Sequence, residues 1–238
     1  ACEAAGLRYV NSAGATGELG PANFRLPTAL GAIKQAALVP ETFAAGDLRR
    51  ASPMLIAGPG GWRDFYPQLC AGNLARQGIE ATDITFDLPE MQAGKFDVTA
   101  TSLARLFERP EVRARVAAQV RERLCGAARV GLPAVIGLEG SRQAWQDLQD
   151  RIGAPVFEIP TLPPCVPGIR LYRALQQALA RAGVQILLDM PANRGQTEAR
   201  RATSVTVPGP VRELTYRAAE IVLATGGLYG GGLTTDYG

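Results

Sequence analysis

The stretch Pro53-Met-Leu-Ile-Ala-Gly-Pro-Gly-Gly61 marks the point where the chain changes to a regular alternation of strands and helices. Its apolar run, Met54 to Ala57, is typical of a short buried strand, and the glycines after it predict a tight turn. A helix over residues 64–77, ended by Gly78, and a second strand over residues 79–86 follow. Because strand, crossover helix and strand in this order are typical of a parallel sheet, the predicted fold class is α/β.

The alternation continues to residue 160 and predicts a four-stranded, mostly parallel domain with crossover helices. The further expected elements are helices over 99–109 and 110–125, a third strand over 133–138, a helix over 141–152 and a fourth strand over 156–159. Ser141 is expected to cap the helix that it opens. Arg113 is expected on the exposed face of its helix, and Leu69 on the apolar face of the helix over 64–77.

Shorter elements are predicted on both sides of this domain. A strand over 7–10, two short strands over 24–39 about a turn near Gly31, and a polar connection over 42–50 precede it. After it, residues 160–169 hold four prolines in ten positions, which predicts a stiff, extended crossing between domains. The remaining expected elements are a helix over 170–182, a strand over 184–188, a hairpin of residues 203–207 and 211–217, and a strand over 221–224.

The last of these strands runs directly into glycine. Ile221 to Ala224 is typical of a buried strand, and Thr225, Gly226 and Gly227 follow it. Since glycine has no side chain, it takes positive φ readily and lets a phosphate-bearing or planar group approach the backbone amides. Such a strand end is typical of a ligand site, and the same glycines are equally typical of a turn or a frayed end.

The composition is that of an ordinary globular protein, with 47% hydrophobic and 20% charged residues. The 25 basic and 22 acidic residues are scattered along the chain, so no basic surface of the kind that binds nucleic acid is indicated. No apolar run approaches the roughly 18 to 20 residues that span a bilayer. The sequence therefore predicts neither a nucleic-acid partner nor a direct membrane span.

The absence of histidine and the wide spacing of the cysteines exclude several kinds of catalytic and metal site. The 238 residues contain no histidine, which excludes a Ser-His-Asp triad, a Cys-His dyad and a histidine-ligated metal within them. Cys2, Cys70, Cys125 and Cys165 lie far apart and form no C-x-x-C pair. A cysteine-bound iron-sulfur cluster or structural zinc is therefore not expected, and no metal site is predicted.

Three basic side chains are candidates for holding a phosphate-bearing substrate, namely Arg25, Lys34 and Arg170. Arg170 lies at the expected N-terminus of a helix, and arginine is suited to bidentate phosphate contact. A solvated surface arginine is the commoner alternative. No catalytic residue is assigned, and Lys34 is the one candidate if this chain supplies a general base.

Three segments together resemble the family of anaerobic glycerol-3-phosphate dehydrogenase B subunits. They are Ala57-Gly-Pro-Gly-Gly-Trp-Arg-Asp-Phe65, Pro160-Thr-Leu-Pro-Pro-Cys-Val-Pro-Gly-Ile-Arg-Leu171 and Val222-Leu-Ala-Thr-Gly-Gly-Leu-Tyr-Gly-Gly-Gly-Leu233. They occur in the family's order and at similar spacing, and the resemblance covers nearly the whole chain. The proline crossing is the specific motif, because an Ala-Thr-Gly-Gly strand end occurs in many two-dinucleotide-binding-domain flavoproteins.

The resemblance implies a Rossmann-like flavin-binding domain that is interrupted by a cap domain. Residues 1–20 and 161–238 would be incomplete pieces of the flavin domain, 53–160 the inserted α/β cap domain and 21–52 a hairpin connection. Ala224, Thr225, Gly226 and Gly227 would pack on the flavin nucleotide. The family's N-terminal G-x-G-x-x-G unit would be missing, so the chain is expected to be an internal fragment that binds no flavin by itself.

The activity that the resemblance implies is oxidation of glycerol 3-phosphate to dihydroxyacetone phosphate in anaerobic respiration, with hydride passing to FAD or FMN. The implied partners are a catalytic A subunit and a membrane-anchored iron-sulfur C subunit, which would hold the protein at the cytoplasmic face of the cell membrane. Two alternatives stay open. One is a flavoprotein of the same superfamily with another substrate, and the other is a non-catalytic α/β interaction module.

Overall fold

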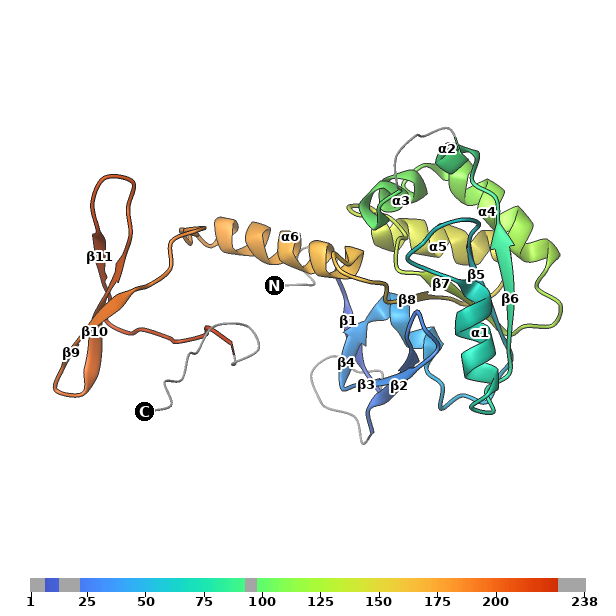
Figure 1. The fold of residues 1–238 in the computed structure, drawn as a ribbon, viewed down its shortest axis with the longest axis horizontal. Coiled ribbons are helices and arrows are strands. Elements are labelled where there is room, and N and C mark those ends of the chain that lie inside the picture. Colours follow the sequence, from blue (N-terminus) through green and yellow to red (C-terminus); the bar gives the residue numbers. More distant parts are fainter. Residues whose placement is uncertain (1–6, 13–21, 93–97, 227–238) are drawn as a thin grey trace. The chain divides into compact units, whose positions relative to one another are not determined.

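The computed structural model describes residues 7–12, 22–92 and 98–226. The chain divides into two compact units, Ala1–Gly183 and Val184–Gly238, whose elements are labelled in Figure 1. The domain boundaries predicted from the sequence concern a flavin domain and a cap, and they stay predictions. Among the described helices, none combines the length and the apolar character that crossing a membrane requires.

The first unit is built on a four-stranded parallel sheet in the order β6-β5-β7-β8, which confirms the predicted α/β fold class. The strands are β5 (Met54–Pro59), β6 (Ala81–Phe86), β7 (Arg129–Pro133) and β8 (Val156–Ile159). Every residue of β5, β7 and β8 is buried, as expected of parallel strands that are covered on both faces. β6 forms an edge of the sheet and includes exposed residues.

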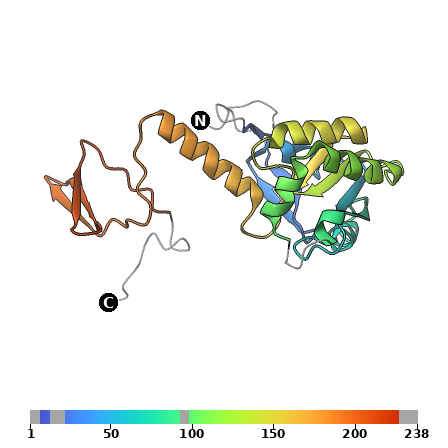
Figure 2. The ribbon, with the colours of Figure 1, turned by 90° about the horizontal axis from the view of Figure 1, so that it is seen from above.

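Helices cover both faces of this sheet (Figure 2). α4 (Pro110–Glu122) and α5 (Ser141–Ile152) pack against each other over one face, and α1 (Pro67–Ala75) packs on β5 and β6 from the other. The shorter helices α2 (Pro89–Gln92) and α3 (Ala100–Phe107) precede α4. The core between these layers holds four buried phenylalanines, Phe65, Phe86, Phe107 and Phe157.

The predicted third strand over residues 133–138 is wrong. The strand is β7, which ends at Pro133, and the chain then turns with Gly137 at φ 75°. Residues 134–136 are buried without pairing as a strand. The prediction followed the apolar run, and an apolar run indicates burial rather than strand pairing. The strand begins instead at Arg129, whose charged guanidinium is accommodated by hydrogen bonds inside the unit.

Helix α1 is shorter than predicted, and one residue of its predicted apolar face is exposed. It begins at Pro67, because proline suits the first turn of a helix, where an amide hydrogen has no intrahelical partner. Leu69 is 44% exposed, so its predicted place on the apolar face is wrong. Phe65 and Leu74, which are expected on the same face, are buried, and Cys70 is buried with them. Phe65 reaches the core from the loop before the helix.

The predicted exposure of Arg113 is also wrong. This side chain is buried between α4 and α5, where its Nε donates to Asp147 at 2.6 Å and its Nη1 donates to the carbonyl of Phe107 at 2.8 Å. Charge alone favours the surface, and the fold supplies the partners that stabilise the buried guanidinium.

The turn before α5 is held by a distant residue. Ser141 is the first residue of the helix, and Gly140 at the cap position has no side chain to bond, so the predicted cap is wrong. The carboxylate of Glu108 instead accepts hydrogen bonds from the amides of Leu138 at 2.7 Å and Glu139 at 2.6 Å. A contact from another element leaves no local pattern in the sequence.

Short antiparallel ribbons flank the parallel sheet. β1 (Tyr9–Asn11) pairs with β4 (Leu38–Pro40), and β2 (Phe24–Pro27) pairs with β3 (Ile33–Ala36), which confirms the two strands predicted about Gly31. The predicted polar connection over 42–50 contains a 3-10 helix, η2 (Glu41–Gly46), that buries Phe43. Its last residues lead into Asp47.

Helix α6 (Val166–Arg181) begins four residues earlier than predicted. Pro167 lies in its first turn, so the prolines of the crossing break regular structure only over residues 160–165. The extended crossing predicted for 160–169 is therefore right for its first part and wrong for its last.

The second unit contains a three-stranded antiparallel sheet in the order β11-β10-β9. The strands are β9 (Arg194–Glu198), β10 (Arg201–Val207) and β11 (Leu214–Arg217), and the β10–β11 pair confirms the predicted hairpin. The strands predicted over 184–188 and 221–224 are wrong, since neither segment pairs with another strand among the described residues. Val222 and Leu223 are 86% and 78% exposed, so their apolar character marks no buried strand.

Candidate functional site

A pocket of about 430 Å³ lies where β5 ends, and we name it the carboxyl-edge pocket. Its lining includes residues 60–64 after β5, residues 98–101 at the start of α3, and Leu162 and Pro164 after β8. The strand order places β6 on one side of β5 and β7 on the other. In open α/β sheets, ligands bind outside the carboxyl ends of the strands at such a point of divergence.

The carboxyl-edge pocket joins two segments that are far apart in the sequence. Residues 60–64 belong to the glycine-rich segment 57–65, and Leu162 belongs to the proline crossing 160–171. Trp62 is buried, and its Nε1 donates to the carbonyl of Val98 at 2.8 Å, which holds the turn against the loop before α3. The lining is mixed, because Met91, Val98 and Leu162 bring apolar surface and Arg63 and Asp64 bring opposite charges.

A second pocket, of about 640 Å³, opens beside β1 and η2. Three arginines, Arg8, Arg49 and Arg50, line it together with the carboxylates of Glu41 and Asp47, and we name it the arginine pocket. Glu41 contacts Arg8 at 3.3 Å and also Arg142 at 3.4 Å, so one carboxylate is shared by two guanidiniums.

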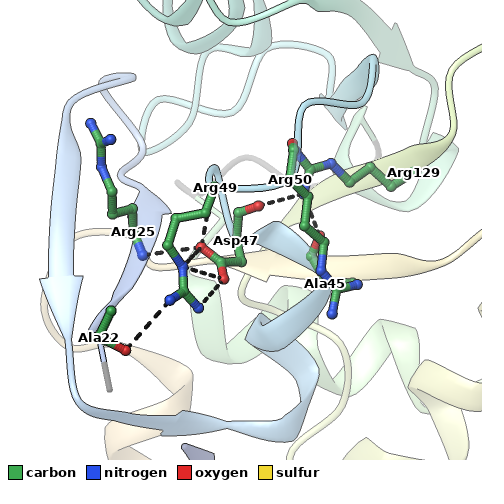
Figure 3. A network of polar contacts seen from close by, with 7 residues as sticks. All are labelled: Ala22, Arg25, Ala45, Asp47, Arg49, Arg50 and Arg129. Carbon is green, nitrogen blue, oxygen red and sulfur yellow. Dashed lines mark hydrogen bonds and ion pairs between the residues drawn. The ribbon is translucent and has the colours of Figure 1, made fainter. Parts of the chain in front are cut away.

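Asp47 organises the polar network of the arginine pocket (Figure 3). Its carboxylate accepts hydrogen bonds from Nε and Nη2 of Arg49, at 2.9 and 2.5 Å to Oδ2, and from the amide of Arg25 at 3.3 Å. Burial by itself would raise the pKa of Asp47, but these hydrogen bonds outweigh burial and lower the pKa below its ordinary value. Asp47 is therefore committed to Arg49 as a carboxylate.

Arg129 lies behind this network and is only 3% exposed. Its Nη1 donates to the carbonyls of Ala45 and Asp47 at 2.8 Å each, and its Nη2 donates to the carbonyl of Arg50 at 3.0 Å (Figure 3). Its Nε is buried and has no hydrogen-bond partner among the described residues. Burial, followed by repulsion from the nearby Arg50, lowers the pKa of Arg129.

Arg170, one of the predicted substrate-binding residues, is buried at 5% exposure. Its guanidinium donates to both carboxylate oxygens of Glu158, to the carbonyl of Gly137 and to the carbonyl of Ile136, all within 2.9 Å. The position of Arg170 gives it a structural role in joining α6 to β8. Its predicted contact with a substrate phosphate stays a prediction.

The structure does not bring the other two predicted substrate residues together. Arg25 pairs with Gln35 and Lys34 pairs with Leu26 in the β2–β3 ribbon, so Arg25 and Lys34 point to opposite faces. Neither lines the carboxyl-edge pocket or the arginine pocket. Figure 3 shows the guanidinium of Arg25 directed away from Asp47.

The predicted cofactor residues lie in the second unit. Ala224, Thr225 and Gly226 are exposed and belong to no strand, while Gly227 lies outside the described residues. Gly226 takes φ 80°, the left-handed backbone that its lack of a side chain permits, and a β-carbon placed there would meet no atom within 4 Å. This open backbone fits the close approach of a ligand. No cluster of acidic or cysteine side chains that could hold a metal occurs in residues 7–12, 22–92 and 98–226.

Sequence reasoning missed the arginine pocket. Arg49 and Arg50 fall in the segment that the sequence predicts as a polar connection, and Arg129 opens a strand whose predicted start lies four residues later. The one local signal is the spacing of Asp47 and Arg49, which places an acid two residues before a base. The burial of Arg129 depends on carbonyls from residues 45–50, which no pattern near Arg129 reports.

Comparison with known proteins shows the family of the chain. The chain matches the family described as "FAD binding domain" over residues 3–236. It is 33% identical over 187 residues to the B subunit of anaerobic glycerol-3-phosphate dehydrogenase from Pectobacterium atrosepticum, an alignment that covers 77% of this chain and 44% of the relative. No solved structure matches the chain significantly.

Relatives of the same name occur in distant organisms. The probable B subunit of anaerobic glycerol-3-phosphate dehydrogenase from Halobacterium salinarum (strain ATCC 29341) is 33% identical over 226 residues, covering 90% of this chain and 53% of the relative. The B subunit from Yersinia pestis bv. Antiqua is 30% identical over 185 residues, covering 76% of this chain and 43% of the relative. The chain spans about half the length of the curated relatives that it matches.

Proposed function

Because the chain belongs to the FAD binding domain family, we propose that it is part of a flavin-dependent dehydrogenase that oxidises glycerol 3-phosphate to dihydroxyacetone phosphate. The observation that carries this proposal is the match along residues 3–236, together with relatives that are named as B subunits of anaerobic glycerol-3-phosphate dehydrogenase. The resemblance read from three sequence segments is confirmed by the names of these relatives.

FAD is the proposed cofactor of the complete protein, with FMN as the alternative. When bound, a flavin accepts a hydride equivalent and passes electrons on singly, which no side chain of this protein can do. The part of this chain proposed to contact it is the backbone of Ala224 to Gly227. The positive φ and open surroundings of Gly226 support that role, because a flavin nucleotide needs close access to backbone amides.

The chain lacks the side chain that most often transfers protons in enzymes. It contains no histidine, so a base of that type must come from elsewhere if one is used. Lys34 stays the one candidate base, and its exposed position on β3 leaves it accessible to a substrate. We assign binding and orientation to this chain and leave the proton acceptor unassigned.

The proposed partners are a catalytic A subunit and an iron-sulfur C subunit anchored in the membrane. The designation of the relatives as B subunits supports an assembly of several chains. These 238 residues contain no C-x-x-C cysteine pair, so a cluster that receives electrons would lie outside them. The assembly is proposed to work at the cytoplasmic face of the cell membrane in anaerobic respiration.

The 238-residue chain by itself is proposed to bind flavin weakly or not at all. Its sequence contains no G-x-G-x-x-G, the phosphate-binding turn of Rossmann-like domains, since Arg63 occupies the third glycine position after Gly58 and Gly60. Titration with FAD, followed by flavin fluorescence, tests this directly. Stoichiometric binding of FAD to this chain would overturn this part of the proposal.

The activity is tested on the complete protein purified with its partner subunits. We expect a flavin absorption spectrum, FAD after denaturation and chromatography, and bleaching of the flavin by glycerol 3-phosphate under anaerobic conditions. Glycerol and lactate serve as controls and are expected to leave the flavin oxidised. A colourless protein would favour the interaction module, and a flavin reduced by another hydroxy acid alone would favour a different substrate.

A further inference from the structure

The arginine pocket contains more positive charge than its carboxylates neutralise. Asp47 is bonded to Arg49, and Glu41 is divided between Arg8 and Arg142. The side chain of Arg50 lines the pocket and has no hydrogen bond or ion pair with any described residue. Among the described residues, Arg50 therefore presents a guanidinium without a counter-charge to the pocket.

Arg129 adds a second uncompensated charge directly behind the pocket. It has no ion pair among the described residues, although buried charges in proteins are normally paired. The three carbonyls that it binds belong to Ala45, Asp47 and Arg50, which are themselves lining residues. One layer of peptide backbone thus separates a buried cation from the pocket, where a bound anion would offset its charge.

The rest of the lining suits a small polar anion. Asn11 and Ser12 bring polar side chains, and Phe24 and Trp145 supply apolar surface. The Nε1 of Trp145 is occupied by the carbonyl of Val156 at 2.7 Å, so Trp145 contributes its ring surface alone. Guanidinium groups bind phosphate oxygens in pairs, and their five donors match the geometry of a phosphate better than an ammonium does.

We propose that the arginine pocket is a binding site for a phosphate monoester, with Arg50 and Arg8 contacting the phosphate and Arg129 offsetting its charge from behind. The identity of the natural ligand rests on the proposed function: it is the phosphate group of the substrate. Free inorganic phosphate has the same binding chemistry. The site differs from the sequence-predicted candidates Arg25, Lys34 and Arg170, none of which lines this pocket.

Calorimetric titration of the 238-residue chain tests the site without any flavin. The probes are inorganic phosphate, sn-glycerol 3-phosphate and glycerol. We expect saturable binding of the first two, no binding of glycerol, and weaker affinity at higher sodium chloride concentration. The substitution Arg50→Gln is expected to weaken both affinities about ten- to a hundredfold, because it removes one charge-assisted contact.

Arg123→Gln is the matched control, since it makes the same charge change at an exposed arginine at the end of α4, outside the pocket. We expect it to change the dissociation constants less than about twofold. Arg129→Lys keeps the buried charge and is expected to retain binding that a folded Arg129→Met variant loses. Thermal unfolding of each variant identifies any that has lost its fold.

The outcomes separate this inference from the proposed function. Equal affinities of Arg50→Gln and Arg123→Gln, or no saturable phosphate binding by the unsubstituted chain, would overturn the inference even if the complete protein oxidises glycerol 3-phosphate. Binding of inorganic phosphate that depends on Arg50, without binding of glycerol 3-phosphate, would support the site and assign it to free phosphate. Failure of glycerol 3-phosphate to reduce the flavin of the complete protein affects the proposed function alone.

Discussion

Arg170 and Glu158 form a bidentate ion pair that is closed to solvent. Nη1 of Arg170 lies 2.7 Å from Oε2 of Glu158, Nη2 lies 2.9 Å from Oε1, and the two side chains are 4% and 0% exposed. The hydroxyl of Thr42 and the amide of Ile136 also donate to this carboxylate, at 2.7 and 3.0 Å. The pair therefore connects η2, β8 and the first turns of α6.

Breaking this pair should destabilise the first unit strongly. Glu158→Gln leaves the guanidinium of Arg170 buried without a counter-charge, and we expect the free energy of unfolding to fall by about 3–5 kcal/mol. The matched control is Glu139→Gln, which breaks the exposed pair of Glu139 with Arg173 and should cost less than about 1 kcal/mol. Urea denaturation followed by circular dichroism measures both, and equal small losses would show that the buried pair contributes little.

The stability of the chain should depend on the ionisation of Asp47. Its pKa in the folded state lies below the ordinary value near 3.8, so its carboxylate contributes stability above that value. This contribution is lost as the pH falls through the folded-state pKa. Asp47→Asn should reduce the free energy of unfolding by about 1–3 kcal/mol at pH 7, and the difference from the unsubstituted chain should shrink below about pH 4. A difference that stays constant from about pH 7 to about pH 3 would contradict the assignment.

The turn before α5 should be weakened more by substitution of Glu108 than by substitution of Ser141. Burial would raise the pKa of Glu108, and the amides of Glu139, Leu138 and Gly140 outweigh it and lower the pKa. Glu108→Ala removes the acceptor from these amides, so we expect a loss of about 1–2 kcal/mol of unfolding free energy. Ser141→Ala serves as the control and should cost less than about 0.5 kcal/mol. A larger loss for Ser141→Ala than for Glu108→Ala in chemical denaturation would contradict this role of Glu108.

Gly226 provides the test of the proposed flavin contact. In the complete protein, Gly226→Val strains a backbone at φ 80° and also places a side chain where the cofactor is proposed to approach. Gly183→Val introduces comparable strain at φ 73°, also with open surroundings, and is the matched control. We expect the flavin content of the purified protein to fall several-fold for Gly226→Val alone. Similar flavin contents in both variants would remove Gly226 from the proposed site.

The cysteines should differ sharply in reactivity. Burial raises the pKa of the Cys70 thiol to about 12, whereas Cys125 is exposed. Since the thiolate is the reactive form, iodoacetamide at about pH 8 should label Cys125 readily and Cys70 only after unfolding. Peptide mapping by mass spectrometry gives the two rates, and comparable labelling in the folded chain would show that Cys70 is not protected.

Several features are readable from the sequence because they depend on neighbours along the chain. The alternation after Pro53 predicts the parallel sheet, since apolar runs of strand length separated by amphipathic segments have few other solutions. The hairpins about Gly31 and Pro208-Gly209-Pro210 follow from turn residues. Local chemistry also predicts the positive φ of Gly226.

Other features depend on contacts between segments that no local pattern reports. Arg113, Arg129 and Arg170 are all buried, because a distant element supplies the hydrogen-bond acceptors of each guanidinium. The sequence predicts Arg113 at the surface, and it gives no local sign that Arg129 or Arg170 is buried. The apolar residues 221–224 are expected in a strand, and they lie outside any strand because no neighbour pairs with them among the described residues. A charge is tolerated inside only where partners converge, and a strand forms only beside another strand.

The amino-acid sequence by itself determined the α/β class of the first unit, the hairpin of the second and the resemblance to a flavoprotein family, because periodicity and motif are properties of neighbouring residues. Only the tertiary structure decided where the polar groups meet. It joined the glycine turn after β5 to the proline crossing at one pocket, and it assembled Arg8, Arg49, Arg50 and the buried Arg129 around another. These sites depend on distances between remote residues, and those distances are set by how the layers pack.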